Sequence, residues 1–271
     1  MTYVLIVFII FLVFYSNRYG WWKKSVSYSC PRILMYHQIS HHIKGAKFNG
    51  LRVTPEMFEQ QIAWLDEQGI NFVTMKQLLA YGDEIPPKTV AITFDDGYED
   101  NYTYALKILK KYNACATLYL VIDRHDNDWS IHKKEHHNSG ELVKDKKLSD
   151  EQVKKLIDSG IIEIAAHTKT HANLSQLNKT EKTTEICGAR EKLQQIFNIE
   201  ITSFAYPFGI YDRDDLELVK NCGFHSAVTT HDGIDCNLLE PFELKRIKVS
   251  GKDNFYAFKL RVRTGKRGWR K

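Results

Sequence analysis

Two adjacent carboxylates and two histidines are the side chains of this chain whose types and spacing are suited to catalysis. Asp95 and Asp96 end an apolar run at 90–94, and Gly97 follows them. This pattern predicts a buried strand that delivers both carboxylates to its C-terminal end, where glycine permits a sharp turn. Buried adjacent carboxylates are costly unless a metal ion or a proton shares the site. Residues 167–171 read His-Thr-Lys-Thr-His, so Asp, His and His form a candidate open metal site, with the second Asp as a candidate base.

Alternating strands and helices must position these side chains. Polar chemistry repeatedly follows the C-terminal end of a predicted strand, which is typical of an α/β barrel or a doubly wound sheet. Residues 124–147 interrupt the alternation, and their histidines lack regular spacing, so they predict a long solvated loop, with a lid over the substrate as the alternative. The predicted strands span 32–36, 71–74, 88–95, 116–122, 161–166, 201–206, 226–229 and 244–249.

Three motifs in order resemble those of the polysaccharide deacetylase family with the NodB-homology domain. They are Thr93–Gly97, His-Thr-x-x-His at 167–171, and Phe-Ala-Tyr-Pro-Phe-Gly at 204–209, each at a predicted strand end. One motif alone is a weak signal, because Asp-Asp pairs often cap turns and histidines four apart often share a polar face. The resemblance covers about residues 31–250. It implies a distorted (β/α) barrel of fewer than eight units that hydrolyses an N-acetyl group of an amino sugar.

The resemblance also implies roles for the first two motifs. Asp96, His167 and His171 would bind one divalent metal ion, and Asp95 would be the general base. Zinc is the expected metal, and nickel, cobalt and iron remain alternatives. A metal in such a site lowers the pKa of its water to about 7 and polarises the acetamide oxygen. Thr168 is expected to support its neighbouring ligand.

The third motif and an early strand supply the remaining candidate site residues. The turn after the strand at 201–206 is expected to stabilise the oxyanion and contact substrate, through Tyr206, Pro207 and Phe208. Tyr36-His37 resembles a strand-end pair in the branch that includes poly-N-acetylglucosamine deacetylases, where the histidine is the general acid. The alternative for His37 is a strand-end histidine hydrogen-bonded to backbone.

The chain departs from the family pattern at two places. Many members carry an arginine shortly before the Pro-Phe-Gly turn, where this chain has Ala205. That arginine orients the catalytic aspartate, and Arg246 is the candidate replacement from another strand; a surface cation is its alternative. The Asp and Trp of a further family motif have only Asp128 and Trp129 as weak candidates.

Charge and hydropathy divide the chain into three predicted parts: a membrane anchor at 1–24, the deacetylase domain at 25–250, and a basic aromatic tail at 251–271. The formal net charge is +5, yet residues 245–271 hold 11 Lys/Arg and one acid, so the basic character lies at the ends of an acidic body. Residues 3–15 are apolar, and an extension to Tyr19 makes a marginal transmembrane helix, with a cleaved signal peptide as the alternative.

The flanking charges predict a membrane partner rather than a nucleic acid. Lys23 and Lys24 follow the apolar run, which favours a single-pass protein of the bacterial inner membrane with a cytoplasmic catalytic domain. The periplasmic or extracellular face is the alternative. Contact of residues 3–22 and the basic tail with a lipid surface favours a lipid-linked amino sugar as substrate. Exopolysaccharide or peptidoglycan outside the membrane is the second hypothesis, and a non-catalytic sugar-binding protein is the third.

Five cysteines bear on the redox compartment. Their number is odd and none are spaced as Cys-x-x-Cys. Free thiols in a reducing compartment are the simplest expectation, and two disulfides with one remaining thiol are the alternative.

Overall fold

A closed parallel barrel forms the centre of the computed structural model, which describes residues 2–127 and 140–268. Neighbouring strands pair in the order β1-β5-β6-β7-β8-β9-β10, and β10 returns to β1. The barrel strands are β1 (Arg32–Tyr36), β5 (Thr89–Asp96), β6 (Ala116–Leu120), β7 (Ile162–Ala166), β8 (Ser203–Ala205), β9 (Ser226–Asp232) and β10 (Leu244–Lys248). The predicted barrel of fewer than eight units is confirmed, and the closed sheet excludes a doubly wound arrangement.

The distortion of the barrel arises at β5. The short strand β4 (Asn71–Val73) pairs with the first half of β5, and β6 pairs with the second half of the same strand. All eight residues of β5 are buried, which explains its continuous apolar sequence. The side chains at the carboxyl end of β5 therefore lie in the closed barrel and are shielded from water.

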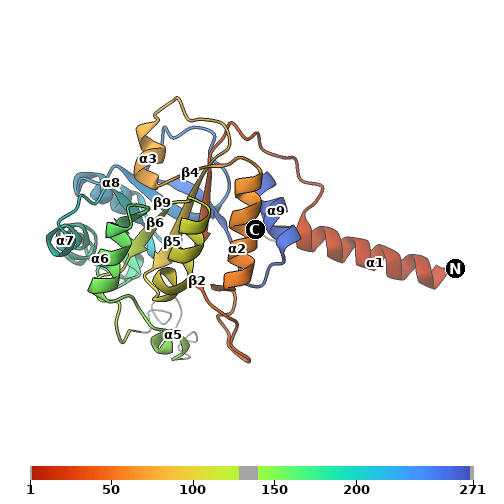
Figure 1. The fold of residues 1–271 in the computed structure, drawn as a ribbon, viewed down its shortest axis with the longest axis horizontal. Coiled ribbons are helices and arrows are strands. Elements are labelled where there is room, and N and C mark those ends of the chain that lie inside the picture. Colours follow the sequence, from red (N-terminus) through yellow and green to blue (C-terminus); the bar gives the residue numbers. More distant parts are fainter. Residues whose placement is uncertain (1, 128–139, 269–271) are drawn as a thin grey trace.

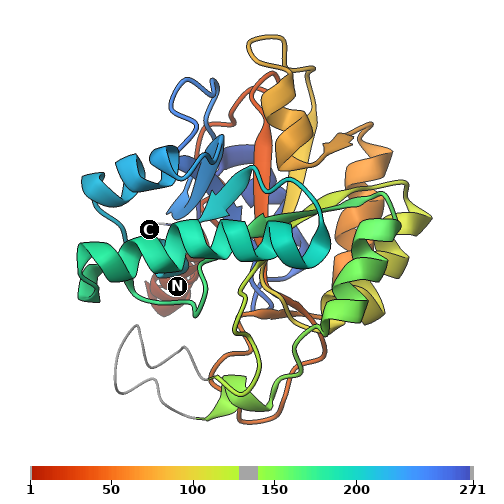
Figure 2. The same ribbon diagram turned by 90° about the vertical axis from the view of Figure 1, so that its left-hand side faces the viewer.

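Helices cover the outside of the barrel (Figures 1 and 2). Side-chain caps define the starts of two of these helices, because Thr54 caps α2 and Ser149 forms a capping box with Gln152 at α6. The covering helices are α2 (Pro55–Glu67), α3 (Met75–Ala80), α4 (Leu106–Lys111), α6 (Asp150–Asp158), α7 (Lys179–Phe197) and α8 (Arg213–Asn221).

Two short elements flank the carboxyl end of the barrel. Strands β2 (Gln38–Ile39) and β3 (Arg52–Val53) pair with each other, and the helix α5 (Glu141–Lys144) lies in the second half of the predicted loop 124–147. The weak candidates Asp128 and Trp129 lie outside the described residues.

Part of the segment predicted as a basic aromatic tail is folded onto the barrel. Residues Phe255–Thr264 form the helix α9, which buries Phe258 and Leu260 and packs against Trp64 of α2. The pattern of aromatic and basic residues in this segment is therefore explained by a helix that buries one of its faces. Buried Asp253 forms ion pairs with Arg261, Arg267 and Arg18, so part of the basic charge is neutralised within the fold.

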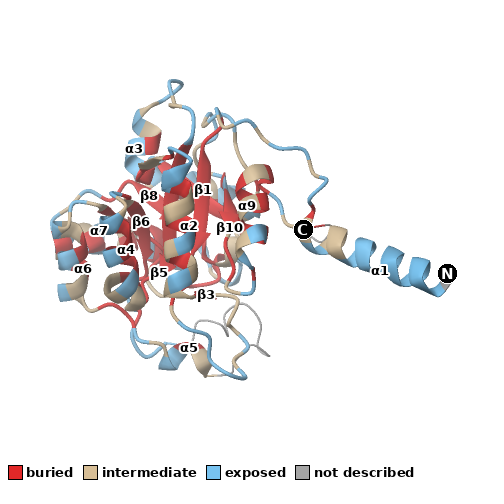
Figure 3. Ribbon diagram, turned by 45° about the vertical axis from the view of Figure 1, so that its right-hand side comes forward, coloured by how far each residue is buried: buried red, intermediate tan, exposed pale blue. Residues whose placement is uncertain are grey.

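The N-terminal helix α1 (Thr2–Tyr19) projects from the barrel and is largely exposed (Figure 3). Its base is attached to α9, because Arg18 donates to the carbonyl of Lys252 at 2.8 Å and Tyr19 pairs with Tyr256. Within residues 2–127 and 140–268, no helix combines the length and apolarity needed to cross a membrane. The predicted transmembrane span is therefore not confirmed.

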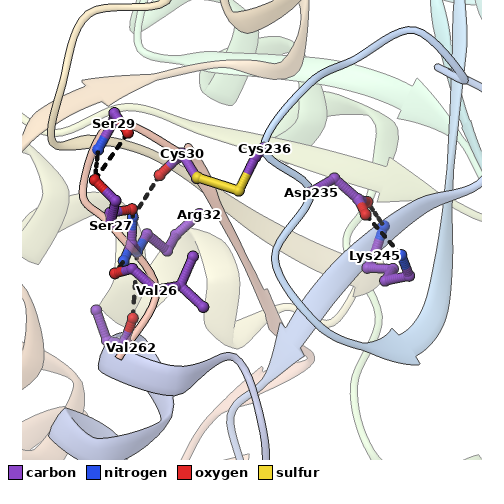
Figure 4. The surroundings of a disulfide bond; sticks show 9 residues. All are labelled: Val26, Ser27, Ser29, Cys30, Arg32, Asp235, Cys236, Lys245 and Val262. Carbon is purple, nitrogen blue, oxygen red and sulfur yellow. Dashed lines mark hydrogen bonds and ion pairs between the residues drawn. A yellow bond between two sulfur atoms is a disulfide. The ribbon is translucent and has the colours of Figure 1, made fainter. Parts of the chain in front are cut away.

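Two disulfides correct the expectation of free thiols. Cys30 is joined to Cys236 (Figure 4), and Cys187 is joined to Cys222, which leaves Cys115 as a free thiol. The partners lie 206 and 35 residues apart in sequence, so spacing gave no signal of their proximity. The first disulfide fixes the chain before β1 to the loop after β9.

Candidate metal centre and catalytic pocket

The candidate metal centre lies where β5 and β7 end. Asp96 is the last residue of β5, and His167 directly follows β7. Asp96, His171 and Phe208 all have positive φ, at 82°, 58° and 60°. Such left-handed conformations are unfavourable for non-glycine residues and often mark functional sites, where surrounding structure enforces them.

The three predicted metal ligands are brought together. His167 Nε2 lies 3.4 Å and His171 Nε2 3.3 Å from Asp96 Oδ1, and all three side chains are buried. The donor atoms of the triad lie within 4.8 Å of one another. Burial opposes ionisation of Asp96, but the two imidazoles outweigh it and hold the pKa of this carboxyl well below its ordinary value.

The donor set fits a divalent metal ion. Ligands about 2.05 Å from a tetrahedral ion lie roughly 3.3 Å from each other, which matches the two nitrogen–oxygen separations. His167 Nδ1 lies 2.8 Å from the carbonyl oxygen of Ala205. A proton on Nδ1 would donate to that carbonyl and leave Nε2 as the ligand atom, the arrangement that orients metal-binding histidines. Burial lowers the pKa of His171 to about 4, so this imidazole is neutral as a ligand must be.

Asp95 is paired with Arg246. The guanidinium donates from Nη1 to Asp95 Oδ1 and from Nη2 to Oδ2, both at 2.7 Å. It is fixed by further bonds to Thr93 Oγ1 at 3.1 Å and to the carbonyl of Thr229 at 2.8 Å. Burial would raise the pKa of Asp95, but Arg246 outweighs this effect and holds it below the ordinary value. Arg246 thus makes the contact expected of it, and it is fully buried rather than a surface cation.

His37 lines the same cavity as the aspartates. Asn101 Nδ2 donates to its backbone carbonyl at 2.9 Å, which fixes the chain where β1 ends. Burial lowers the pKa of His37, while the carboxylates of Asp96 and Asp95 oppose that effect. The imidazole is therefore neutral at rest, and a role as general acid requires it to gain a proton before the amine leaves.

The turn at 206–209 forms another side of the cavity. The ring of Phe208 packs edge-on against His171 with centroids 4.5 Å apart. Pro207 has no N–H, and the N–H of Gly209 donates to the carbonyl of Tyr206 at 3.0 Å, so neither supplies an oxyanion donor. The N–H of Tyr206 likewise donates to the carbonyl of Val228 at 3.2 Å, and an oxyanion role for the Phe208 N–H stays a prediction. Pro207 is buried and does not line the cavity.

The apolar part of the cavity wall was not predicted from the sequence. The cavity has a volume of about 300 Å³, and its apolar lining includes Phe48, Leu51 and Leu142. The spacing of these three residues in the sequence does not indicate that they line a cavity. Lys248 also lines the cavity, and alternation along β10 gave a signal, because it lies two residues after Arg246 and so on the same face of the strand.

Glu185 of α7 is a second missed residue. Its carboxylate accepts the N–H groups of Lys169 and Thr170 and the hydroxyl of Thr170, each at 2.9 Å. These bonds shape the segment between His167 and His171. A buried glutamate on a long helix has no sequence signal that connects it with a loop 15 residues earlier.

Comparisons with known proteins agree with this geometry. A family model described as polysaccharide deacetylase matches residues 82–227. The chain is 32% identical over 232 residues to YxkH of Bacillus subtilis (strain 168), covering 84% of this chain and 75% of YxkH. It is 30% identical over 208 residues to the poly-beta-1,6-N-acetyl-D-glucosamine N-deacetylase of Staphylococcus aureus (strain MRSA252), covering 73% and 68% of the two chains.

Solved structures give the same result. BC0361, a polysaccharide deacetylase from Bacillus cereus, superposes with a TM-score of 0.72 at 26% identity, covering 86% of this chain and 69% of BC0361. The Streptococcus pyogenes deacetylase PplD in complex with acetate superposes with a TM-score of 0.71 at 26% identity, covering 89% and 99%. The chain therefore belongs to the polysaccharide deacetylase family, and it is a sugar deacetylase that hydrolyses an amide bond.

Proposed function

We propose that this protein removes N-acetyl groups from a poly-N-acetylglucosamine-type exopolysaccharide outside the cytoplasm. The observation that carries the proposal is the placement of Asp95, paired with Arg246, beside the buried triad in one cavity. The staphylococcal relative is named for a polymer of N-acetylglucosamine, so we prefer a polymer to the lipid-linked amino sugar favoured by the charge pattern.

The buried triad supplies the electrophilic part of the chemistry. Asp96, His167 and His171 would hold one divalent ion, which when bound polarises the acetamide carbonyl and acidifies water. The donor set suits zinc, with nickel, cobalt and iron as alternatives. The Phe208 N–H is the proposed donor to the oxygen that becomes negative as the carbonyl carbon turns tetrahedral.

Asp95 and His37 are the proposed proton carriers. Asp95 is ionised, because Arg246 lowers its pKa, so it accepts the proton of the attacking water. Arg246 binds both oxygens of Asp95 and thereby fixes its orientation. His37, on the adjacent strand β1, takes up a proton from solvent and donates it to the sugar nitrogen as the carbon–nitrogen bond breaks, and Asp95 later returns its proton to solvent. Acetate and a free amine are the products.

The extracytoplasmic location is supported by the two disulfides, since stable disulfides are typical of oxidising compartments. The exposed apolar helix α1 is the proposed attachment to the cell envelope. The location is tested by counting the free thiols of protein that is isolated without reductant and then denatured. One reactive thiol, Cys115, is expected, and five would contradict this location.

Acetate release tests the activity. Purified protein is incubated with a β-1,6-linked N-acetylglucosamine pentamer before and after removal of metal by a chelator. Release is expected to stop on chelation and to return on addition of zinc. Binding of the pentamer without any acetate release at saturating zinc would favour the non-catalytic sugar-binding alternative.

A further inference from the structure

We propose that Arg52, Glu141 and Asp145, here called the loop latch, join two surface segments so that these form the apolar wall of the candidate active site. The first segment is 40–51, between β2 and β3. The second is 141–145, which contains α5. These residues are positioning residues, because none of the three lines the cavity. Their effect on substrate binding rests on the proposed function, while their effect on the loops does not.

The latch is centred on a buried guanidinium. The side chain of Arg52 is 1% exposed, and it donates from Nη1 to Glu141 Oε1 and from Nη2 to Asp145 Oδ2, both at 2.7 Å. Each carboxylate is 16% exposed. One charged group of β3 therefore connects with both ends of the short helix α5. A lysine has a single nitrogen and cannot reproduce this fork.

The carboxylates extend these connections to the backbone of the first segment. Glu141 accepts the N–H of Lys47 at 2.8 Å and the N–H of Phe48 at 3.1 Å. Asp145 accepts from Gln38 Nε2 at 2.8 Å, next to the candidate acid His37. Each oxygen named here has a defined donor, so the two segments are held in one relative position rather than merely attracted by charge.

The wall fixed by this network is apolar. Phe48 and Leu51 from the first segment and Leu142 from α5 line the cavity that also contains the metal triad. Behind them, Tyr98 and Val121 complete a small cluster that is separate from the barrel core. Within the described residues, the latch joins the two segments in addition to this small apolar contact. The position of the wall, and with it the fit of a sugar chain, therefore depends on the ion pairs.

The sharpest test separates sugar binding from chemistry at the metal. We compare the wild type with Arg52→Gln and Glu141→Gln on the N-acetylglucosamine pentamer and on p-nitrophenyl acetate, a small ester that does not require the wall. Arg52→Gln is expected to raise KM for the pentamer about tenfold, with kcat changed by less than about threefold and ester turnover unchanged. Glu141→Gln should give a smaller rise in KM, because Asp145 still holds Arg52.

The matched control is Lys111→Met, which removes an exposed ion pair with Glu59 at 2.6 Å. It should leave KM unchanged on both substrates. If Arg52→Gln fails to fold, Glu141→Gln decides the matter. A KM unchanged in the folded variants, or an equal loss on pentamer and ester, would overturn the proposal.

A second readout is independent of catalysis. Lys44 and Lys47 are exposed trypsin sites in the first segment. Loss of the latch is expected to accelerate cleavage there about tenfold while the melting temperature of the barrel changes little. If the wild type releases no acetate, the proposed function fails, and this measurement still judges the latch. Unchanged cleavage in both variants would contradict it.

Discussion

Arg246 and Arg52 are both buried and bind carboxylates, and they differ in what those carboxylates face. Arg246 of β10 places both of its terminal nitrogens on Asp95, a residue of the catalytic cavity. Arg52 of β3 divides its nitrogens between Glu141 and Asp145, which lie behind the cavity wall. All four contacts measure 2.7 Å, so the distances alone do not distinguish the two sites.

The difference shows that an ion pair has a function set by its surroundings. A guanidinium on a reacting carboxylate controls the charge and orientation of that carboxylate, and its loss should appear in kcat. A guanidinium shared between two loops controls their separation, and its loss should appear in KM. Steady-state kinetics of matched substitutions at the two arginines therefore test whether one acts on kcat and the other on KM.

Among the substitutions of charged partners, the largest effect is expected from Arg246→Met. This change leaves Asp95 as an unpaired buried charge, which costs on the order of 3–5 kcal/mol in stability, and it releases the orientation of the base. We expect kcat for the pentamer to fall about 10²- to 10³-fold with KM nearly unchanged. Steady-state kinetics on folded, metal-loaded protein provide the measurement. A variant with normal kcat and raised KM would show that Arg246, like Arg52, acts on substrate binding, and would contradict the difference between them.

Arginine-to-lysine changes at both sites sharpen the comparison. Arg246→Lys keeps the charge and loses the bidentate geometry, so kcat should fall about tenfold. Arg52→Lys reaches one of its two carboxylates, so KM should rise roughly threefold with kcat unchanged. The two substitutions are compared under identical conditions on the pentamer. Identical kinetic signatures for both would show that the sites do not have separate roles.

Sequence motifs predicted the barrel and the residues at its strand ends, because both depend on local pattern. The apolar run of β5 and the two aspartates at its end, Asp95 and Asp96, made the metal centre predictable from the sequence. Arg246 was predicted only because Ala205 stands where many family members have an arginine, so that another arginine had to replace it. It lies outside the segment matched by the family model, which ends at residue 227.

The remaining features depend on contacts distant in sequence. Arg52 and Glu141 are 89 residues apart and carry no motif. Cys30 and Cys236 meet only because the barrel closes between β1 and β10. The basic C-terminal segment was predicted to contact a lipid surface, and its helical form with a buried face becomes apparent only against Trp64 of α2. Non-local packing, rather than propensity, determined each of these.

Asp100, a half-buried acid beside the latch, tests what happens to a carboxylate that has no direct arginine partner among the described residues. Asp100 accepts hydrogen bonds from the Ile39 N–H and Asn101 Nδ2, both at 3.0 Å, and burial raises its pKa to about 7. The ordinary value is about 3.9, so the folded state holds an extra proton between these values, and stability should fall as pH rises from about 4 to about 7.

Asp100→Asn should remove this dependence while retaining an acceptor oxygen. Between pH 5.5 and 7.5, we expect the wild type to lose about 2 kcal/mol of unfolding free energy relative to the variant. Urea denaturation at both pH values gives the difference. If the two proteins show parallel pH dependences, Asp100 is ionised throughout and the contrast with Asp95 fails.

The smallest effect is expected at the exposed pair of Lys111 and Glu59. Their side chains are 62% and 38% exposed, so solvent screens the attraction. Lys111→Met should change the free energy of unfolding by less than about 0.5 kcal/mol. Urea denaturation checks this value, and a loss comparable to that of Arg246→Met would show that burial does not separate these pairs.

The most direct test of the central claim is acetate release by Asp95→Asn protein whose metal content has been measured. Asp95 is proposed to accept the proton of water, while Asp96, His167 and His171 hold the metal. The variant should therefore bind metal like the wild type and release acetate about 10³-fold more slowly. Acetate release at the wild-type rate from the metal-loaded variant would contradict the account.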